Sequence, residues 1–193
     1  MQPIEQDRTI KSETKYEGKI INVREDTILL DSGGQAQREV AEHRPAVAIL
    51  PIDQENNALL VRQYRHPTKQ MILEVPAGLV ELGEEPDDSA MRELREETGY
   101  SSRNLRLLGG LWSSPGFTDE YLYCYIAKDL VENRLQPDED EEITVERIPL
   151  SRVTILPFES SCIPCCPLNN VSGTITSSPS HCIPMFQIKF FEV

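Results

Sequence analysis

Three glutamates near the middle of the chain have the side chains and the spacing that a metal site requires. They are Glu93, Glu96 and Glu97, in the segment "RELREE". Residues three or four positions apart share one face of a helix, so these carboxylates would lie together. Like charges in that position repel, whereas hard divalent ions such as Mg²⁺ or Mn²⁺ prefer oxygen ligands. The pattern predicts a cation site, and a solvated acidic helix face is the alternative.

The residues around the glutamates predict a helix over 87–98. Pro86 suits the first turn, and Asp87 and Asp88 suit the positive end of the helix dipole. Gly99 stands where a C-cap glycine is expected. The face predicted to contact a core carries Ala90, Met91, Leu94 and Thr98.

Strand-like segments precede and follow this helix. Residues 16–42 read as a hairpin that turns at "DSGG", residues 31–34. The segments "AVAILPI", "ALLVRQYR" and "MILEVP" come before the helix, and "LRLLGGLW", "YLYCYIA" and "ITVERIPL" come after it. Apolar runs of this length bounded by turn residues are typical of strands. The order of strands, one helix and more strands predicts an α+β domain.

The composition excludes several classes of partner. The chain has 193 residues and a formal net charge of −13, so nucleic acid and anionic membranes would be repelled. The first residues lack the apolar core of a signal peptide, and no stretch of eighteen apolar residues occurs. We therefore expect a soluble, cytoplasmic protein. Of its cysteines, Cys124 stands apart from four near the C-terminal end, so no disulfide framework is expected.

The spacing around the glutamates extends to a longer pattern. Five residues separate Gly78 from Glu84, and seven more precede "RELREETGY", residues 92–100. This arrangement of glycines, glutamates, arginine and apolar residues is the pattern known as the Nudix box. The chain therefore resembles a Nudix hydrolase. In that family the box forms a loop, a helix and a second loop, which hold divalent metals against the diphosphate of a nucleoside diphosphate linked to another group X.

The resemblance implies roles for the residues of the box. Glu93 and Glu97 would be the main metal ligands, and Glu96 a further ligand or a neighbour of the ligands. The resemblance also implies that the carbonyl of Ala77 turns towards a metal, because Gly78 allows a backbone conformation closed to other residues. Structural roles are expected for two more residues, a bidentate clamp on the carboxylates for Arg92 and orientation of the helix or the metal shell for Glu84.

Outside the box, the resemblance covers roughly residues 36–151 and points to the ADP-ribose pyrophosphatase branch. Its marker is a proline about fifteen residues beyond the box, and Pro115 in "SPGF" fits it, with Phe117 beside it as a substrate contact. Arg65 resembles the family's phosphate-contacting arginine, since its planar fork suits paired phosphate oxygens. Glu74 is expected at the nucleotide or at the edge of the core, and Arg62 at the strand surface.

The acidic segment "DEDEE", residues 138–142, resembles the loop that closes over the metals in this branch. By alignment on the following strand, Glu141 is implied as a ligand for an additional metal and Glu139 as the general base. The two are only two positions apart, so their roles can be exchanged.

Together these residues imply a fold and a reaction. The fold is an α+β Nudix fold, an α/β/α sandwich around a mixed sheet with an N-terminal antiparallel β extension. The reaction is Mg²⁺-dependent hydrolysis of ADP-ribose to AMP and ribose 5-phosphate, with Mn²⁺ as the other possible ion. Nucleotide sugars, NADH and dinucleoside polyphosphates remain alternative substrates, and a non-catalytic nucleotide sensor is the alternative function. The branch also implies a homodimer in which N-terminal strands are exchanged, and packing of the hairpin at residues 16–42 on its own domain is the alternative.

Three regions follow from these boundaries. Residues 1–42 form the N-terminal β extension and possible dimerisation element, residues 43–157 the Nudix domain, and residues 158–193 a tail rich in serine, proline and cysteine. The tail is expected to be disordered or foreign to the fold, for instance from a frame shift. The reason is that charged residues become rare there and the apolar residues lose their helical spacing. A zinc site at its cysteines is disfavoured because a second cysteine pair is missing. The segment "PLSRVTIL" resembles the start of a closing helix.

Overall fold

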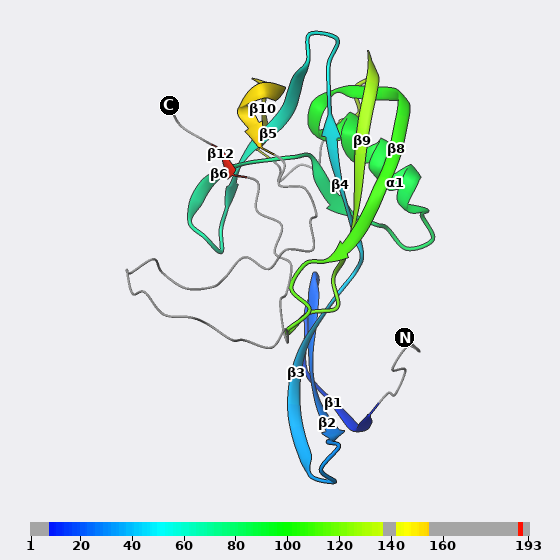
Figure 1. Cartoon of the computed structure of the whole chain (residues 1–193), viewed down its shortest axis with the longest axis vertical. Coiled ribbons are helices and arrows are strands. Elements are labelled where there is room, and N and C mark those ends of the chain that lie inside the picture. Colours follow the sequence, from blue (N-terminus) through cyan, green and yellow to red (C-terminus); the bar gives the residue numbers. More distant parts are fainter. Residues whose placement is uncertain (1–7, 137–141, 155–188, 191–193) are drawn as a thin grey trace, which may run out of the picture.

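The computed structural model of the chain describes residues 8–136, 142–154 and 189–190. Within them lie an N-terminal sheet, a four-stranded mixed sheet and a three-stranded antiparallel sheet (Figure 1). The strands are β1 (Thr9–Glu17), β2 (Ile21–Leu29), β3 (Gln35–His43), β4 (Ala46–Pro51), β5 (Asn57–Arg65), β6 (Gln70–Glu74), β7 (Ala77–Leu79), β8 (Tyr100–Trp112), β9 (Tyr121–Glu132), β10 (Thr144–Pro149), β11 (Val153–Thr154) and β12 (Lys189–Phe190). The helical segments are α1 (Pro86–Glu93), the π-helix η1 (Leu94–Thr98) and the 3-10 turn η2 (Leu150–Arg152).

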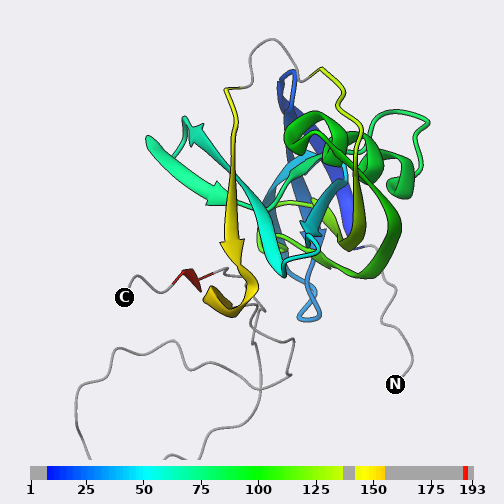
Figure 2. The same ribbon diagram turned by 90° about the horizontal axis from the view of Figure 1, so that it is seen from above.

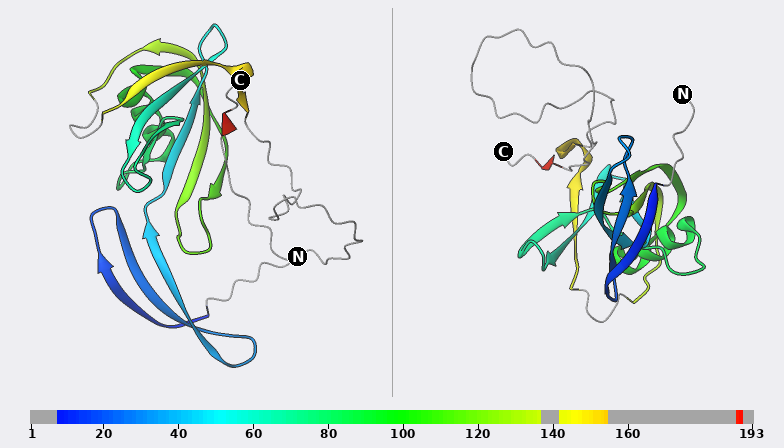
Figure 3. Two further views of the ribbon diagram at one scale, coloured as in Figure 1. Left: turned by 90° about the vertical axis from the view of Figure 1, so that its left-hand side faces the viewer. Right: turned by 90° about the horizontal axis from the view of Figure 1, so that it is seen from below.

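The N-terminal sheet has the order β1-β2-β3 and projects from one end of the remaining structure (Figure 3). Its hairpin between β2 and β3 turns where the sequence predicts, with Leu30 N donating to Gly34 O at 2.8 Å and Gly33 at φ 81°. Strand β1, which sequence reasoning did not predict, pairs with β2, and all its residues are exposed. This sheet therefore buries little apolar surface of its own.

Two further sheets carry the core. The mixed sheet has the order β7-β4-β9-β8, in which β4 and β9 run parallel and the other pairs antiparallel. The second sheet has the order β10-β5-β6 and is antiparallel throughout. Strand β4 and the first half of β5 are buried because the chain is apolar there at nearly every position. The predicted α+β class with a mixed sheet is confirmed.

The helix lies along the mixed sheet, while the β5–β6 hairpin extends away from it (Figure 2). Its limits, Pro86 to Thr98, agree with the prediction to one residue, and Gly99 ends it in the left-handed region at φ 83°. Ala90 and Leu94 are fully buried against a cluster that includes Val47, Ile49, Tyr125 and Ala127. Sequence reasoning did not predict that the last turn is π-helical, a geometry that often marks functional sites.

The predicted closing helix is wrong within the described residues. After β10 the chain forms only the 3-10 turn η2 and then the short strand β11, which pairs with β12. Val153 and Thr154 are β-branched, which favours an extended backbone over a helix. The described part thus shows helix on one side of the mixed sheet, and most of the predicted tail lies outside it. No described helix has the length and apolar character needed to span a membrane.

Candidate active site

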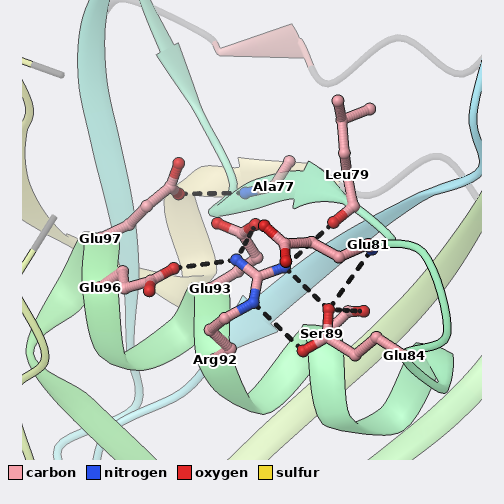
Figure 4. Close-up of polar contacts among 9 residues, drawn as sticks. All are labelled: Ala77, Leu79, Glu81, Glu84, Ser89, Arg92, Glu93, Glu96 and Glu97. Carbon is pink, nitrogen blue, oxygen red and sulfur yellow. Dashed lines mark hydrogen bonds and ion pairs between the residues drawn. The ribbon is translucent and has the colours of Figure 1, made fainter. Parts of the chain in front are cut away.

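The last helical turn is joined to β7 through a carboxylate. Glu97 Oε2 accepts a hydrogen bond from Ala77 N at 3.0 Å (Figure 4). Glu93 and Glu97 are only 7% and 3% exposed, respectively, on a helix whose other side packs on the core. Burial of charge is costly unless partners compensate it, so two buried glutamates facing one strand point to a functional arrangement. Of the two sequence readings, the solvated acidic face is excluded.

Gly78 lies next to the carboxylate of Glu93, and the structural reason for a glycine there differs from the predicted special backbone conformation. Its φ is not positive, and it pairs with Val47 as an ordinary residue of β7. A Cβ at position 78 would instead overlap the carboxylate of Glu93. The glycine is therefore required because a side chain would displace Glu93, and the prediction of a special backbone conformation was wrong.

Arg92 occupies the centre of the carboxylate cluster, as the sequence predicts. Its Nη1 donates to Glu93 Oε1 at 2.6 Å and to Glu96 Oε2 at 2.9 Å. Its Nε and Nη2 donate to Glu84 Oε1 and Oε2 at 3.1 and 3.0 Å, and Nη2 also reaches Leu79 O at 3.1 Å. Burial lowers the pKa of the guanidinium, but its bonds to Glu84 and Glu93 outweigh this and raise it. One cation thus fixes three carboxylates.

Glu84 anchors the loop before the helix, the structural role predicted for it. Besides Arg92, it accepts a hydrogen bond from Ser89 Oγ at 2.6 Å. The bond from Arg92 lowers the pKa of Glu84, and that effect exceeds the opposing effect of burial. Sequence reasoning missed Ser89, which is fully buried. Its signal is a hydroxyl five positions after a box glutamate, in the first helical turns.

The donor chemistry of this cluster fits a hard divalent ion. The described residues bring together no three histidine, cysteine or acidic side chains able to hold an ion by themselves. Mg²⁺, however, is commonly bound by one or two carboxylates together with water and substrate phosphates. Glu93 and Glu97 supply two such carboxylates, and Glu96, beside them, accepts a hydrogen bond from Arg92. The predicted contributions of the Ala77 carbonyl and of Glu141 stay predictions.

Arg65 and Glu74, both predicted to bind substrate, contact each other on neighbouring strands. Arg65 Nε donates to Glu74 Oε2 at 2.7 Å. Arg62 lies on the opposite face of β5, because side chains alternate along a strand, and it pairs there with Glu146. The expectation that Arg62 is a surface residue agrees with this placement. The structure thus puts the two arginines in separate environments.

The segment with Pro115 and Phe117 forms the connection between β8 and β9. Phe117 is 61% exposed, and its carbonyl accepts from Ala41 N at 2.7 Å. Asp119 Oδ1, which sequence reasoning did not single out, accepts from His43 N at 2.8 Å. The end of the N-terminal sheet is therefore fastened to this connection.

The two glutamates predicted for proton transfer and for an additional metal, Glu139 and Glu141, lie outside the described residues. The structure describes the chain up to residue 136 and again from residue 142. The nearest described strands before and after them are β9 and β10, which belong to two different sheets.

Comparison with known proteins agrees with this geometry. The chain matches the family model of the NUDIX domain over residues 42–161, and that of the nucleoside diphosphate sugar hydrolase N-terminal domain over residues 8–41. It is 37% identical to an ADP-ribose pyrophosphatase of Bacillus subtilis (strain 168), over 75% of this chain and 80% of the relative. It is 40% identical to a methanol dehydrogenase activator of Bacillus methanolicus, with the same coverage.

A solved structure shows the same fold. The crystal structure of an ADP compounds hydrolase superposes with a TM-score of 0.68 at 28% identity, covering 74% of this chain and 78% of that one. The range that matches the NUDIX family model, residues 42–161, includes the whole carboxylate cluster and its arginine. The chain therefore belongs to the Nudix family and is a pyrophosphohydrolase of the kind that works with divalent metal ions.

Proposed function

We propose that this protein hydrolyses ADP-ribose to AMP and ribose 5-phosphate, with Mg²⁺ as the metal and Mn²⁺ as a substitute. The observation that carries the proposal is the pair of buried carboxylates, Glu93 and Glu97, held against β7. The names of the Bacillus subtilis relative and of the solved structure support ADP-linked compounds as the substrate class.

The protein groups have distinct tasks in this reaction. When bound, the divalent ions neutralise the diphosphate and acidify a water molecule. Glu93, Glu97 and the backbone carbonyl of Ala77 would hold those ions, and Glu96 would be a further ligand or a neighbour of the ligands. Arg92 holds the carboxylates of Glu93 and Glu96 in place before metal arrives, because its Nη1 donates a hydrogen bond to each of them.

A proton must leave the attacking water as its oxygen forms a bond to phosphorus and the P–O bond of the leaving group breaks. We assign its acceptance to Glu139, and an additional metal contact to Glu141, with exchange of the two roles as the alternative. The support is their position in an acidic segment between β9 and β10 and their resemblance to the family loop. Glutamate side chains are among the groups that serve as general bases for such a proton.

The ADP-ribose side is assigned to Arg65, Glu74, Pro115 and Phe117. Arg65 projects a guanidinium whose present partner, Glu74, is a single carboxylate, which leaves the fork donors able to turn to phosphate. Phe117 presents an exposed ring beside the end of the N-terminal sheet. An exposed aromatic ring suits contact with a base or a ribose.

We further propose a homodimer built through residues 1–42, with residues 43–157 as the catalytic domain and residues 158–193 as a separate tail. The support is the N-terminal sheet, which leaves exposed several large apolar side chains: Ile10, Tyr16, Ile20, Ile21 and Leu29. A three-stranded sheet with so little burial gains stability by covering that surface with a second copy.

A substrate panel tests the proposed reaction. ADP-ribose, ADP-glucose, NADH and a dinucleoside polyphosphate are each incubated with protein and Mg²⁺, and products are separated by chromatography. We expect ADP-ribose to give the highest kcat/KM. Equal or better turnover of another compound would reassign the substrate within the family.

The alternative is a protein that binds nucleotide without hydrolysis, and the activator name of the Bacillus methanolicus relative favours a role exerted on another protein. Glu97→Gln decides between them. Hydrolysis by the wild type with a loss of about 10²- to 10³-fold in the variant supports catalysis, because one metal ligand is weakened. Binding of ADP-ribose by both without turnover would establish the sensor.

A further inference from the structure

The chain that leaves β9 is fastened to the last turn of the Nudix helix. The guanidinium of Arg95 donates from Nε to Asn133 O at 3.2 Å and from Nη2 to Asn133 Oδ1 at 3.3 Å. In the opposite direction, Asn133 N donates to Gly99 O at 2.9 Å, and Leu135 N donates to Arg95 O at 3.3 Å. We call this set of contacts the Arg95 tether.

The tether satisfies backbone groups that a helix end normally leaves open. The last carbonyls of a helix have no partner within it. Here Arg95 O accepts from Gly99 N at 3.1 Å as well as from Leu135 N. Gly99 also lies against Arg134, whose Nε would stand 3.4 Å from a Cβ at that glycine. The helix thus ends on a neighbouring segment of chain rather than in solvent.

The same turn carries the metal-binding carboxylates. Glu96 and Glu97 follow Arg95 directly, and Glu97 is bonded to Ala77 N at 3.0 Å. The turn is therefore held from two directions, by β7 through Glu97 and by residues 133–135 through Arg95. Loosening either attachment gives the Glu97 carboxylate a wider range of positions, and catalytic groups require placement within fractions of an ångström.

The tether also fixes the course of the described chain just after β9. Because Arg95 bonds to both the backbone and the side chain of Asn133, it fixes the direction of the chain there as well as its position. Residues 133–135 are thereby held against the helical turn that carries Glu96 and Glu97.

We propose that Arg95 is a positioning residue for metal-dependent hydrolysis, which acts through Asn133 and touches neither metal nor substrate. The proposal rests on the proposed function for its catalytic consequence. The Nudix box does not specify a residue type at the position between Leu94 and Glu96, and the proposal gives Arg95 a role there.

The test compares Arg95→Ala with Arg62→Ala on the full-length protein. Arg62 is a matched control because its guanidinium also bridges two segments, through Glu146, on the far face of β5. Three quantities are measured: kcat and KM for ADP-ribose, the Mg²⁺ concentration for half-maximal rate, and Mn²⁺ binding to substrate-free protein by electron paramagnetic resonance. Thermal unfolding of each variant accompanies them.

For Arg95→Ala we expect kcat to fall about tenfold or more and the half-maximal Mg²⁺ concentration and the Mn²⁺ dissociation constant to rise about fivefold, with KM within about threefold. Arg62→Ala should stay within about twofold of wild type in every quantity. A purely structural role would lower the unfolding temperature without this separation of kcat from KM. Equal behaviour of the two variants overturns the proposal.

Asn133→Ala provides a second route if Arg95→Ala folds poorly. It removes only the Oδ1 acceptor, so a smaller loss of kcat is expected. In the double variant the losses should not multiply, because both residues act through one contact. Multiplying losses overturn the tether. Absence of ADP-ribose hydrolysis in the wild type would refute the proposed function instead, and the Mn²⁺ titration would still decide the role of Arg95.

Discussion

The carboxylate of Glu93 lies against the backbone of Gly78, in the space that a Cβ at position 78 would fill. Gly78 belongs to β7 and Glu93 to the last turn of α1, so this contact joins the mixed sheet to the helix that carries the carboxylate cluster. The contact is possible only without a side chain at position 78. The position of β7 and the position of the Glu93 carboxylate therefore depend on each other.

Gly78→Ala should remove activity while the protein stays folded. The methyl group would displace the carboxylate of Glu93 by about an ångström, and misplacement on that scale costs about 10²-fold in rate. Steady-state hydrolysis and circular dichroism check this. Gly34→Ala is the control, because a Cβ there meets only ordinary contacts. Retention of full activity in Gly78→Ala would show that Glu93 has room to move without consequence.

Arg92→Ala should destabilise the protein and make its stability depend on Mg²⁺. Removal of the guanidinium leaves Glu84, Glu93 and Glu96 without their shared cation, at a cost of about 2 to 4 kcal/mol in the free energy of unfolding. Added Mg²⁺ supplies positive charge at the same carboxylates, so it should raise the melting temperature more in the variant than in the wild type. Calorimetry with and without Mg²⁺ measures this, with Arg106→Ala as an exposed control.

Glu84 should make the free energy of unfolding of the metal-free protein fall at acid pH. Its pKa in the folded state is lowered from 4.5, mainly by the hydrogen bond from Arg92. A lowered pKa means that this contribution is complete above the unfolded-state value and is lost as pH falls below it, through the folded-state value. Glu84→Gln should flatten the decline of unfolding free energy from pH 5 downward. Denaturant titrations at several pH values test it, and an unchanged slope would contradict the assignment.

Arg65→Ala should weaken substrate use where Arg62→Ala does not. A charge-assisted hydrogen bond to phosphate is worth about 1.5 to 3 kcal/mol, so kcat/KM should fall about ten- to a hundredfold. Arg62 stands three positions away on the same strand and faces Glu146 on the other side. Similar losses in both variants would mean that the strand, and not the phosphate contact, had been disturbed.

Ile20→Glu should separate the proposed homodimer into monomers. Ile20 is 61% exposed and lies between β1 and β2. In the proposed dimer a second copy would cover this side chain, so a glutamate there would be buried without a partner, which is costly. Light scattering coupled to size exclusion measures the mass, and Lys19→Glu controls for the added charge beside it. A dimer that survives Ile20→Glu places the interface elsewhere.

Local sequence signals were sufficient for the helix and much of the cluster. Pro86 and Gly99 mark the helix ends because the first lacks a donor that is not needed there and the second tolerates a left-handed backbone. The apolar positions Ala90 and Leu94 then determine which face of the helix packs on the core. The positions of Glu93 and Glu97 around the helix are determined by the same spacing. Strand β1 escaped prediction because most of its residues are polar and all are exposed, which leaves no alternating apolar pattern.

The sequence by itself determined the type of chemistry, because spacing along one helix decides which carboxylates can approach one another. Only the tertiary structure decided why Gly78 is required, which carboxylates Arg92 joins, and that Arg95 holds Asn133. These relations link residues brought together by the pairing of β4 with β7 and by the return of β9 to the helix end. Such contacts depend on the packing of distant segments, which no local pattern of residues encodes.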